Sequence, residues 1–388
     1  MDPLRTFFME DYLEGSRFTA RYNLGESGGR PVTVGELLGG SGVSPERAAD
    51  VFLSTPLNDS PNWGRADLRD SVAAMHPGAT RDNVLITTGT SEALLLLFRQ
   101  LRPRRVALAW PAFQLLYELP MQQGAEVVRL PVRWDARGVP SVDTAEWLER
   151  LERERPEVVI LNTPHNPTGL VLEPALLDAV ARWAEAAGAT VVGDEHYRFL
   201  SSDTQVLGAT VYRPGSRTFV TGSFIKCLGC PGLRIGWCVG DTAVLAGMQN
   251  EKNYTTHTVN PVTEWIAHEV LKELDSPALR LARDGWRRNR ATLSAFLERS
   301  RGVYGAAPSG GLVTCIGLRG VTDAEGNEAR LAALSAAGVF VLPLSAMEVG
   351  ELDGTHPLER GYGFRLGLGM APERFAEALE AIERATAR

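Results

Sequence analysis

The strongest constraint on the fold is an alternation of short apolar runs with helical patterns, which begins at residue 84. The runs are apolar on both faces, as in a parallel sheet that is covered by helices on both sides. Seven strands are predicted: VLITT (84–88), VALAW (106–110), EVVRL (126–130), EVVILN (157–162), TVVGDE (190–195), TFVTG (218–222) and RIGWCVG (234–240). A turn joins the last two, so one strand is expected to run antiparallel. The pattern predicts an α/β fold with a mostly parallel seven-stranded sheet sandwiched by helices.

The pattern changes after residue 240, where two long helical segments (261–274 and 277–300) precede a second series of elements. Strands are expected in this series at 312–318, 338–342 and 363–368, and helices at 327–337 and 372–387. We therefore expect three parts: an N-terminal segment (1–45) that packs with the small domain, a large domain (46–280) and a small C-terminal α/β domain (281–388).

The N-terminal part has weaker patterns. Residues 3–14 are typical of a short amphipathic helix, whereas the Gly-rich passage 25–43 is expected to be irregular. Within 57–75 the chain passes from a loop into a helix, and Asp67 is a plausible N-cap because a carboxylate can accept a free backbone N–H.

Composition narrows the functional classes. The chain has 40 basic and 47 acidic residues and a net charge of −7, which argues against a broad nucleic-acid surface. No apolar run reaches the ~18 residues of a membrane span. The first residues mix acids with apolar side chains and lack a basic stretch, unlike a signal peptide, so a cytoplasmic location is expected.

The four cysteines are compatible with a reducing compartment. Cys227 and Cys230 form a CxxC pair, but a structural zinc site needs four ligands and no second pair lies nearby. We expect no metal and interpret these cysteines as small buried residues in a turn.

The stretch TGSFIKCLGCPGLRIGWCVG (221–240) has the most informative polar residues. Lys226 lies between an apolar strand and a glycine-rich turn, with Ser223 before it and Arg234 after it. A hydroxyl and a guanidinium suit a phosphate, and a lysine of lowered pKa can form a Schiff base with an aldehyde. Together they suggest pyridoxal 5′-phosphate (PLP). A surface lysine beside a structural arginine is the alternative.

Three further stretches end predicted strands. TTGTSEAL (87–94) would place the N–H groups and hydroxyls of Thr90 and Ser91 at a helix N-terminus, as in a phosphate cup or a simple hydroxyl cap. PAFQLLY (111–117) offers Phe113 for stacking on a flat ring, or for the core. GDEHYRF (193–199) offers Asp194, whose carboxylate could hold a pyridine nitrogen protonated, although a capping Asp and a packed Tyr197 would have the same sequence.

These motifs, with NTPHNPTG (162–169), resemble the fold-type I PLP enzymes of the class I/II aminotransferase superfamily over most of the chain. The resemblance implies that Lys226 is the Schiff-base lysine and proton shuttle, that Asp194 pairs with the pyridine nitrogen, and that Arg365 clamps the substrate α-carboxylate. The other implied cofactor contacts are Gly89, Thr90, Ser91, Ser223 and Arg234 at the phosphate, Phe113 on the ring, and Asn166 and Tyr197 at the ring hydroxyl.

The chain departs from the superfamily pattern at a few positions. Ile225 and Cys230 replace a small and an aliphatic residue, without touching a catalytic atom. Asp59 stands where a tyrosine often reaches the partner subunit's phosphate. Ser27 and Asp59 are expected on the substrate side, and carboxylates such as Glu26 and Asp59 would favour a substrate with a cationic distal group.

Within the superfamily, DPLRTFFMEDYL with PVTVGELL, and CPGLRIGWCVG, resemble the capreomycidine synthase-like enzymes, which eliminate a hydroxyl from a modified arginine and close a ring. We therefore expect removal of the Cα proton of an amino acid, followed by β- or γ-elimination with cyclisation or replacement. Transamination to a 2-oxo acid is the alternative, and an aminotransferase-like ligand-sensing regulator is a remote one. The resemblance and the stretch TTHTVNP (255–261) also imply a homodimer with shared active sites.

Overall fold

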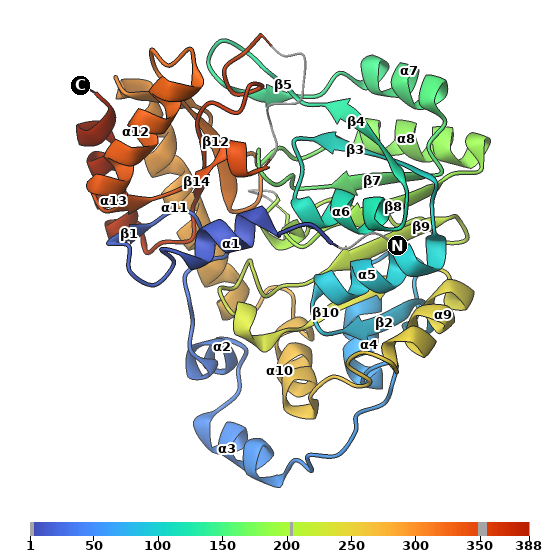
Figure 1. Ribbon diagram of the computed structural model, residues 1–388. Coiled ribbons are helices and arrows are strands. Elements are labelled where there is room, and N and C mark those ends of the chain that lie inside the picture. Colours follow the sequence, from blue (N-terminus) through green and yellow to red (C-terminus); the bar gives the residue numbers. More distant parts are fainter. Residues whose placement is uncertain (1–3, 202–204, 348–354, 388) are drawn as a thin grey trace.

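Seven strands form the central sheet of the computed structural model, which describes residues 4–201, 205–347 and 355–387 (Figure 1). Neighbouring strands run parallel except at β10, which is antiparallel to both of its neighbours. All seven predicted strands and the antiparallel one are confirmed. Their spatial order is β2 (Val84–Thr87), β10 (Gly236–Val239), β9 (Thr218–Gly222), β8 (Thr190–Asp194), β7 (Val158–Asn162), β3 (Arg105–Trp110) and β4 (Glu126–Pro131).

Side chains from the two faces of the sheet enter two separate cores. In β3, Ala107 and Ala109 pack into one core, and Val106 and Leu108 into the other. The first core includes residues of α7 (Thr144–Glu154) and α8 (Pro174–Ala187), and the second includes residues of α5 (Thr90–Leu101), α6 (Gln114–Gln122) and α9 (Thr242–Lys252). Burial on both faces explains why these strands are continuously apolar in sequence.

The C-terminal part contains a separate four-stranded antiparallel sheet, which confirms the predicted second α/β layer. Helix α13 contacts both α11 and α12 beside this sheet (Figure 1). Helix α10 (Pro261–Leu271) precedes this part, whose elements are α11 (Pro277–Arg299), β11 (Val303–Gly305), β12 (Val313–Leu318), α12 (Ala324–Ala336), β14 (Leu342–Pro343), β15 (Phe364–Gly367) and α13 (Pro372–Thr386). A short ribbon, β5 (Arg133–Trp134) with β6 (Pro140–Ser141), follows β4.

The N-terminal segment lies against the C-terminal part. Strand β1 (Tyr22–Asn23) pairs in parallel with β13 (Val339–Phe340), and α1 (Phe8–Glu14) contacts the 3₁₀ turn Leu344–Met347. The N-terminal segment therefore packs on the C-terminal part, and the division into residues 1–45, 46–280 and 281–388 stays a prediction. In the part of the chain that the structure describes, no helix has both the length and the apolarity to cross a membrane.

Two local expectations were wrong. The passage 25–43 contains the helix α2 (Val34–Gly40), which begins at a capping box in which Thr33 and Glu36 satisfy each other's backbone N–H groups. Helix α4 (Ala66–Ala73) has Arg65, not Asp67, at its N-cap. The carboxylate of Asp67 lies inside the first turn, where it accepts hydrogen bonds from the Arg65 guanidinium.

Gly236 of β10 lies against the start of α5, so a side chain there has no room. A Cβ atom would lie 2.6 Å from the carbonyl carbon of Gly89 and 2.7 Å from the backbone nitrogen of Thr90. We expect Gly236→Ala to lower the free energy of unfolding by about 1–3 kcal/mol, because strand and helix must separate.

Gly232→Ala is the control, because no heavy atom lies within 4 Å of a Cβ at that position. Its effect is expected to stay within about 0.5 kcal/mol. Both values can be measured by urea denaturation of the purified protein, and equal unfolding free energies for the two variants would contradict the expectation.

Candidate active site

The register of three parallel strands brings Asn162, Asp194 and Thr221 side by side at the carboxyl edge of the sheet. The Asn162 amide donates to Asp194 Oδ2 at 3.2 Å, and the Thr221 hydroxyl donates to Asp194 Oδ1 at 3.3 Å. All three side chains are buried. Ligands of open α/β sheets bind at this edge, so the carboxylate lies where a cofactor is expected.

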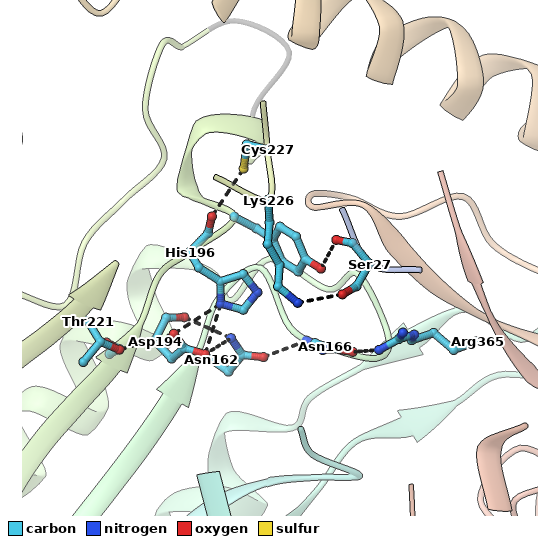
Figure 2. A network of polar contacts seen from close by, with 11 residues as sticks. Ser27, Asn162, Asn166, Asp194, His196, Thr221, Lys226, Cys227 and Arg365 are labelled. Atoms are coloured by element: carbon cyan, nitrogen blue, oxygen red, sulfur yellow. Dashed lines mark hydrogen bonds and ion pairs between the residues drawn. The ribbon is translucent and has the colours of Figure 1, made fainter. Parts of the chain in front are cut away.

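Lys226 comes from the turn after β9, and the negative charge of Asp194 acts on its amine (Figure 2). Its Nζ donates to Ser27 Oγ at 2.7 Å and lies 5.7 Å from the centre of the Phe113 ring. Burial, followed by the positive charge of Arg365, lowers the pKa of Lys226 to about 8. A neutral amine is therefore accessible near neutral pH, as Schiff-base chemistry requires.

Ser27 is the residue at which several side chains of the site meet. Besides accepting from Lys226 through its hydroxyl, it accepts the Tyr197 hydroxyl at its carbonyl oxygen, at 2.6 Å (Figure 2). Burial raises the pKa of Tyr197, so its hydroxyl stays protonated and acts as a donor. Because Ser27 comes from the N-terminal segment, that segment closes the site over residues of the large sheet.

Arg365 of β15 is 1% exposed, and its charged head points into the same site. It donates from Nη1 to Asn166 Oδ1 at 3.1 Å and from Nη2 to the Gly25 carbonyl at 2.7 Å. Its Nε is buried and has no hydrogen-bond partner among the residues that the structure describes. Burial lowers the pKa of this guanidinium, and the negative charges of Glu26 and Glu10 act against that effect.

The residues of the expected phosphate cup lie together at the start of α5. Gly89 is the N-cap and has a φ of 85°, and a Cβ there would lie 3.0 Å from Arg234 Nη2. Thr90 and Ser91 open the helix, so their free N–H groups and the guanidinium form a compact positive site that fits a phosphate. Ser223 donates to the Ile235 carbonyl at 2.7 Å within the lysine turn, and its contact with the phosphate stays a prediction.

Glu92 and Asp59 make contacts that the sequence did not indicate. The Glu92 carboxylate accepts the backbone N–H of Thr88 at 2.7 Å and the hydroxyls of Thr255 and Thr256 at 3.0 and 2.6 Å. It thus ties the stretch 255–261 to the phosphate cup. Asp59 is exposed and accepts from the Thr258 hydroxyl at 3.4 Å.

Three residues that donate to or contact the Asp194 carboxylate were not predicted from the sequence: Asn162, Thr221 and His196. Asn162 and Thr221 could have been predicted from their positions in the sequence. Polar residues near the ends of neighbouring apolar strands meet when the strands are parallel. All four cysteines are free and buried, and burial raises the pKa of Cys230 to about 12. Within the described ranges, no cluster of His, Cys, Asp and Glu could hold a metal ion.

Comparison with known proteins identifies the family. A family model described as aminotransferase class I and II matches residues 33–384. The capreomycidine synthase of Streptomyces vinaceus is 30% identical over 346 residues, which cover 86% of this chain and 85% of that protein. The arginine–pyruvate transaminase AruH of Pseudomonas aeruginosa is 28% identical over 348 residues, covering 87% and 84%.

Solved structures of PLP-dependent enzymes share the fold of this chain. The PLP-dependent cyclase OrfR has a TM-score of 0.83 at 25% identity, with 99% of this chain and 97% of that chain covered. A PLP-dependent aminotransferase from Streptococcus suis shares the fold with a TM-score of 0.87 at 24% identity, covering 99% and 98%. The resemblance read from the motifs is confirmed: this chain belongs to the class I and II aminotransferase family and is a fold-type I, PLP-dependent enzyme.

Proposed function

We propose that this enzyme removes the Cα proton of an amino acid and then eliminates a β or γ substituent, with cyclisation or replacement. The observation that carries the proposal is the similarity to a capreomycidine synthase over 86% of the chain, joined by a likeness to a PLP-dependent cyclase over 99%. The enzyme would act in the biosynthesis of a specialised metabolite, in the cytoplasm.

The residues present fit PLP. Gly89, the first turn of α5 and Arg234 would hold the phosphate, and Asp194 would face the pyridine nitrogen. Phe113, whose ring lies near Lys226, would stack on the pyridine ring. When bound, PLP supplies an aldehyde that joins an amino group and a ring that accepts the electron pair left at Cα.

The chain's own groups would then divide the remaining work. Arg365 would bind the α-carboxylate in a fork of two N–H donors, which fixes the direction of the Cα–H bond. Lys226 would take the Cα proton, because its lowered pKa leaves a neutral amine available. Ser27 would keep the amine in place through its 2.7 Å hydrogen bond, while Asn166 and Tyr197 would contact the ring hydroxyl.

Acidic side chains support a substrate with a cationic distal group. Arg17 donates to Glu10 and to Glu26, each at 2.9 Å, in the N-terminal segment that also carries Ser27. The negative charges of Glu10 and Glu26 act on Lys226 and Arg365, where they raise the pKa of both groups against the effect of burial. We propose that a guanidinium or a sulfonium would be favoured there, with Asp59 as a more distant contributor.

Transamination is the second candidate, because AruH, a transaminase by name, is 28% identical over 87% of the chain. Both reactions need the same lysine, ring contacts and carboxylate clamp. The site residues therefore do not distinguish elimination from transamination, and the two reactions must be distinguished by their products.

The test of the proposed reaction is mass analysis of products from the PLP-loaded enzyme. Arginine, hydroxylated arginines, S-adenosylmethionine, aspartate and phenylalanine would each be incubated with and without a 2-oxo acid. We expect a cationic substrate to lose its β or γ substituent without a 2-oxo acid. Turnover only with a 2-oxo acid, together with formation of the matching amino acid, would show transamination instead.

The same panel tests the distal site through two charge-removing variants. We expect Glu26→Gln to raise the KM of the best cationic substrate about tenfold, as for loss of a partly desolvated charge pair. Asp59→Asn is the comparison and is expected to have a smaller effect, because Asp59 is exposed. If aspartate or phenylalanine is the best substrate and neither variant changes its KM, the cationic distal group is refuted.

Lys226 gives a prediction about pH. The neutral amine attacks the aldehyde, and its pKa is about 8. The rate at which cofactor-free enzyme captures PLP should therefore rise about tenfold per pH unit below that value and level off above it. Stopped-flow absorbance from pH 6 to 10 measures the rate, with Lys226→Ala as the control that forms no covalent band. An inflection near the ordinary lysine value would contradict the lowered pKa.

We also propose a homodimer with active sites at the subunit interface. Helix α3 (Pro45–Ser54) has no buried residue, and Figure 1 shows it extending away from the body of the chain. The exposed side chains of Leu53, Leu57 and Tyr254 lie on or beside α3 and the stretch 255–261, at 88%, 83% and 87% exposure. The Lys252 ammonium links the loop before α4 to the stretch 255–261, because it donates to the carbonyls of Asn62 and His257. Burying such apolar surface against a second copy would stabilise both.

Light scattering after size exclusion tests the dimer. We expect the wild type to be a dimer and Leu53→Arg to raise its dissociation constant at least tenfold, because a charge would enter an apolar contact. Phe18→Arg is the control, since Phe18 is equally exposed, at 84%, but lies in the segment after α1. A fully active wild-type monomer at working concentration would remove the proposal.

A further inference from the structure

One buried titratable side chain of the site has no role in the function proposed above. His196 lies just beyond β8, and its Nδ1 is 3.2 Å from Asp194 Oδ1 and 3.1 Å from Oδ2 (Figure 2). It is 5% exposed, and Asp194 is 1% exposed. The imidazole is thus a third contact to the carboxylate, besides Asn162 and Thr221.

The hydrogen bond has a defined direction. An ionised carboxylate can only accept, so the proton must be on His196 Nδ1. The other ring nitrogen, Nε2, is buried and has no hydrogen-bond partner within the described ranges. The Nδ1 contact to Asp194 is therefore the polar interaction that orients this ring in the structure.

The ring is also held by its surroundings. The imidazole packs on the Tyr197 ring, with centroids 4.1 Å apart and planes at 53°. The backbone carbonyl of His196 accepts a hydrogen bond from the Cys227 thiol at 3.3 Å. Cys227 directly follows Lys226. The ring contact with Tyr197 and the backbone contact with the lysine turn restrict His196, so its imidazole contacts Asp194 in a preformed geometry.

A preformed donor at this carboxylate has a chemical consequence. Asp194 can keep a pyridine nitrogen protonated only if it is ionised and correctly directed. Asn162 and Thr221 each donate to one carboxylate oxygen, whereas His196 lies close to both. Loss of the histidine donor would leave the carboxylate less stabilised and less firmly oriented.

We infer that His196 is a positioning residue that holds the Asp194 carboxylate toward the cofactor ring through Nδ1–H. The inference goes beyond the proposed function, because elimination and transamination both need the protonated ring. It concerns the direction and charge of Asp194, and it gives His196 no contact with the substrate.

The test uses substitutions that separate the two ring nitrogens. His196→Asn can place an amide N–H near the position of Nδ1, His196→Gln places one near Nε2, and His196→Leu has no donor. We expect Leu and Gln to lower kcat about 10–100-fold, the usual effect of losing a hydrogen bond to a charged group. Asn should retain most of the activity, and KM should change little in all three.

Two readouts separate positioning from a general structural effect. At a fixed pH, the absorption spectrum of bound PLP in the Leu and Gln variants should shift in the same direction as in Asp194→Asn, while the Asn variant keeps the wild-type spectrum. In the Asp194→Asn background, His196→Leu should cause no further loss of kcat, because its effect acts through that carboxylate.

Three results would overturn the inference. One is a His196→Leu variant whose kcat lies within about twofold of the wild-type value and whose PLP absorption spectrum is that of the wild type. Another is an equal loss in the Asn, Gln and Leu variants, and the third is a loss that multiplies with that of Asp194→Asn. If the Leu variant does not fold, the comparison of Asn with Gln gives the same decision, since both carry an amide and differ only in where it is placed.

Discussion

The candidate active site is built around the buried carboxylate of Asp194. A charge that is removed from water destabilises the fold unless hydrogen-bond donors surround it. The register of β7, β8 and β9 brings two such donors, Asn162 and Thr221, from the ends of neighbouring strands. Lys226 lies in the turn that follows β9, where the charge of Asp194 acts on its amine. The arrangement of the sheet thus determines where the groups of the candidate site meet.

The N-terminal segment completes the site from the opposite side. Ser27 accepts hydrogen bonds from Lys226 and Tyr197, and Gly25 accepts one from Arg365. Residues of the large sheet and of the C-terminal sheet therefore meet on one short stretch of chain. The contacts also exclude water, which lowers the pKa of both Lys226 and Arg365. This closure therefore accounts for the lowered pKa of Lys226 and for the burial of the Arg365 guanidinium.

Much of the fold could be predicted because its signals are local. The seven strands are apolar on both faces, so runs such as VALAW (106–110) are identifiable without knowledge of their neighbours. Helix α2 was missed because its Gly-rich sequence outweighed the capping box of Thr33 and Glu36. Asp67 was predicted at the N-cap because an acidic residue is favourable both at that position and in the first turn of a helix. In the structure it lies in the first turn, where it pairs with Arg65.

The sequence alone determined the strands, the lysine motif with Arg234 and, through its resemblance, the cofactor. It did not determine that Ser27 meets Lys226, or that His196 turns back onto Asp194. The first pair is separated by 199 residues, and such contacts depend on how whole elements pack rather than on neighbouring residues. The second pair is close in sequence, but its geometry depends on the packing of Tyr197 and the position of Cys227. Local pattern specified the elements, and only their packing in three dimensions brought the charged groups together.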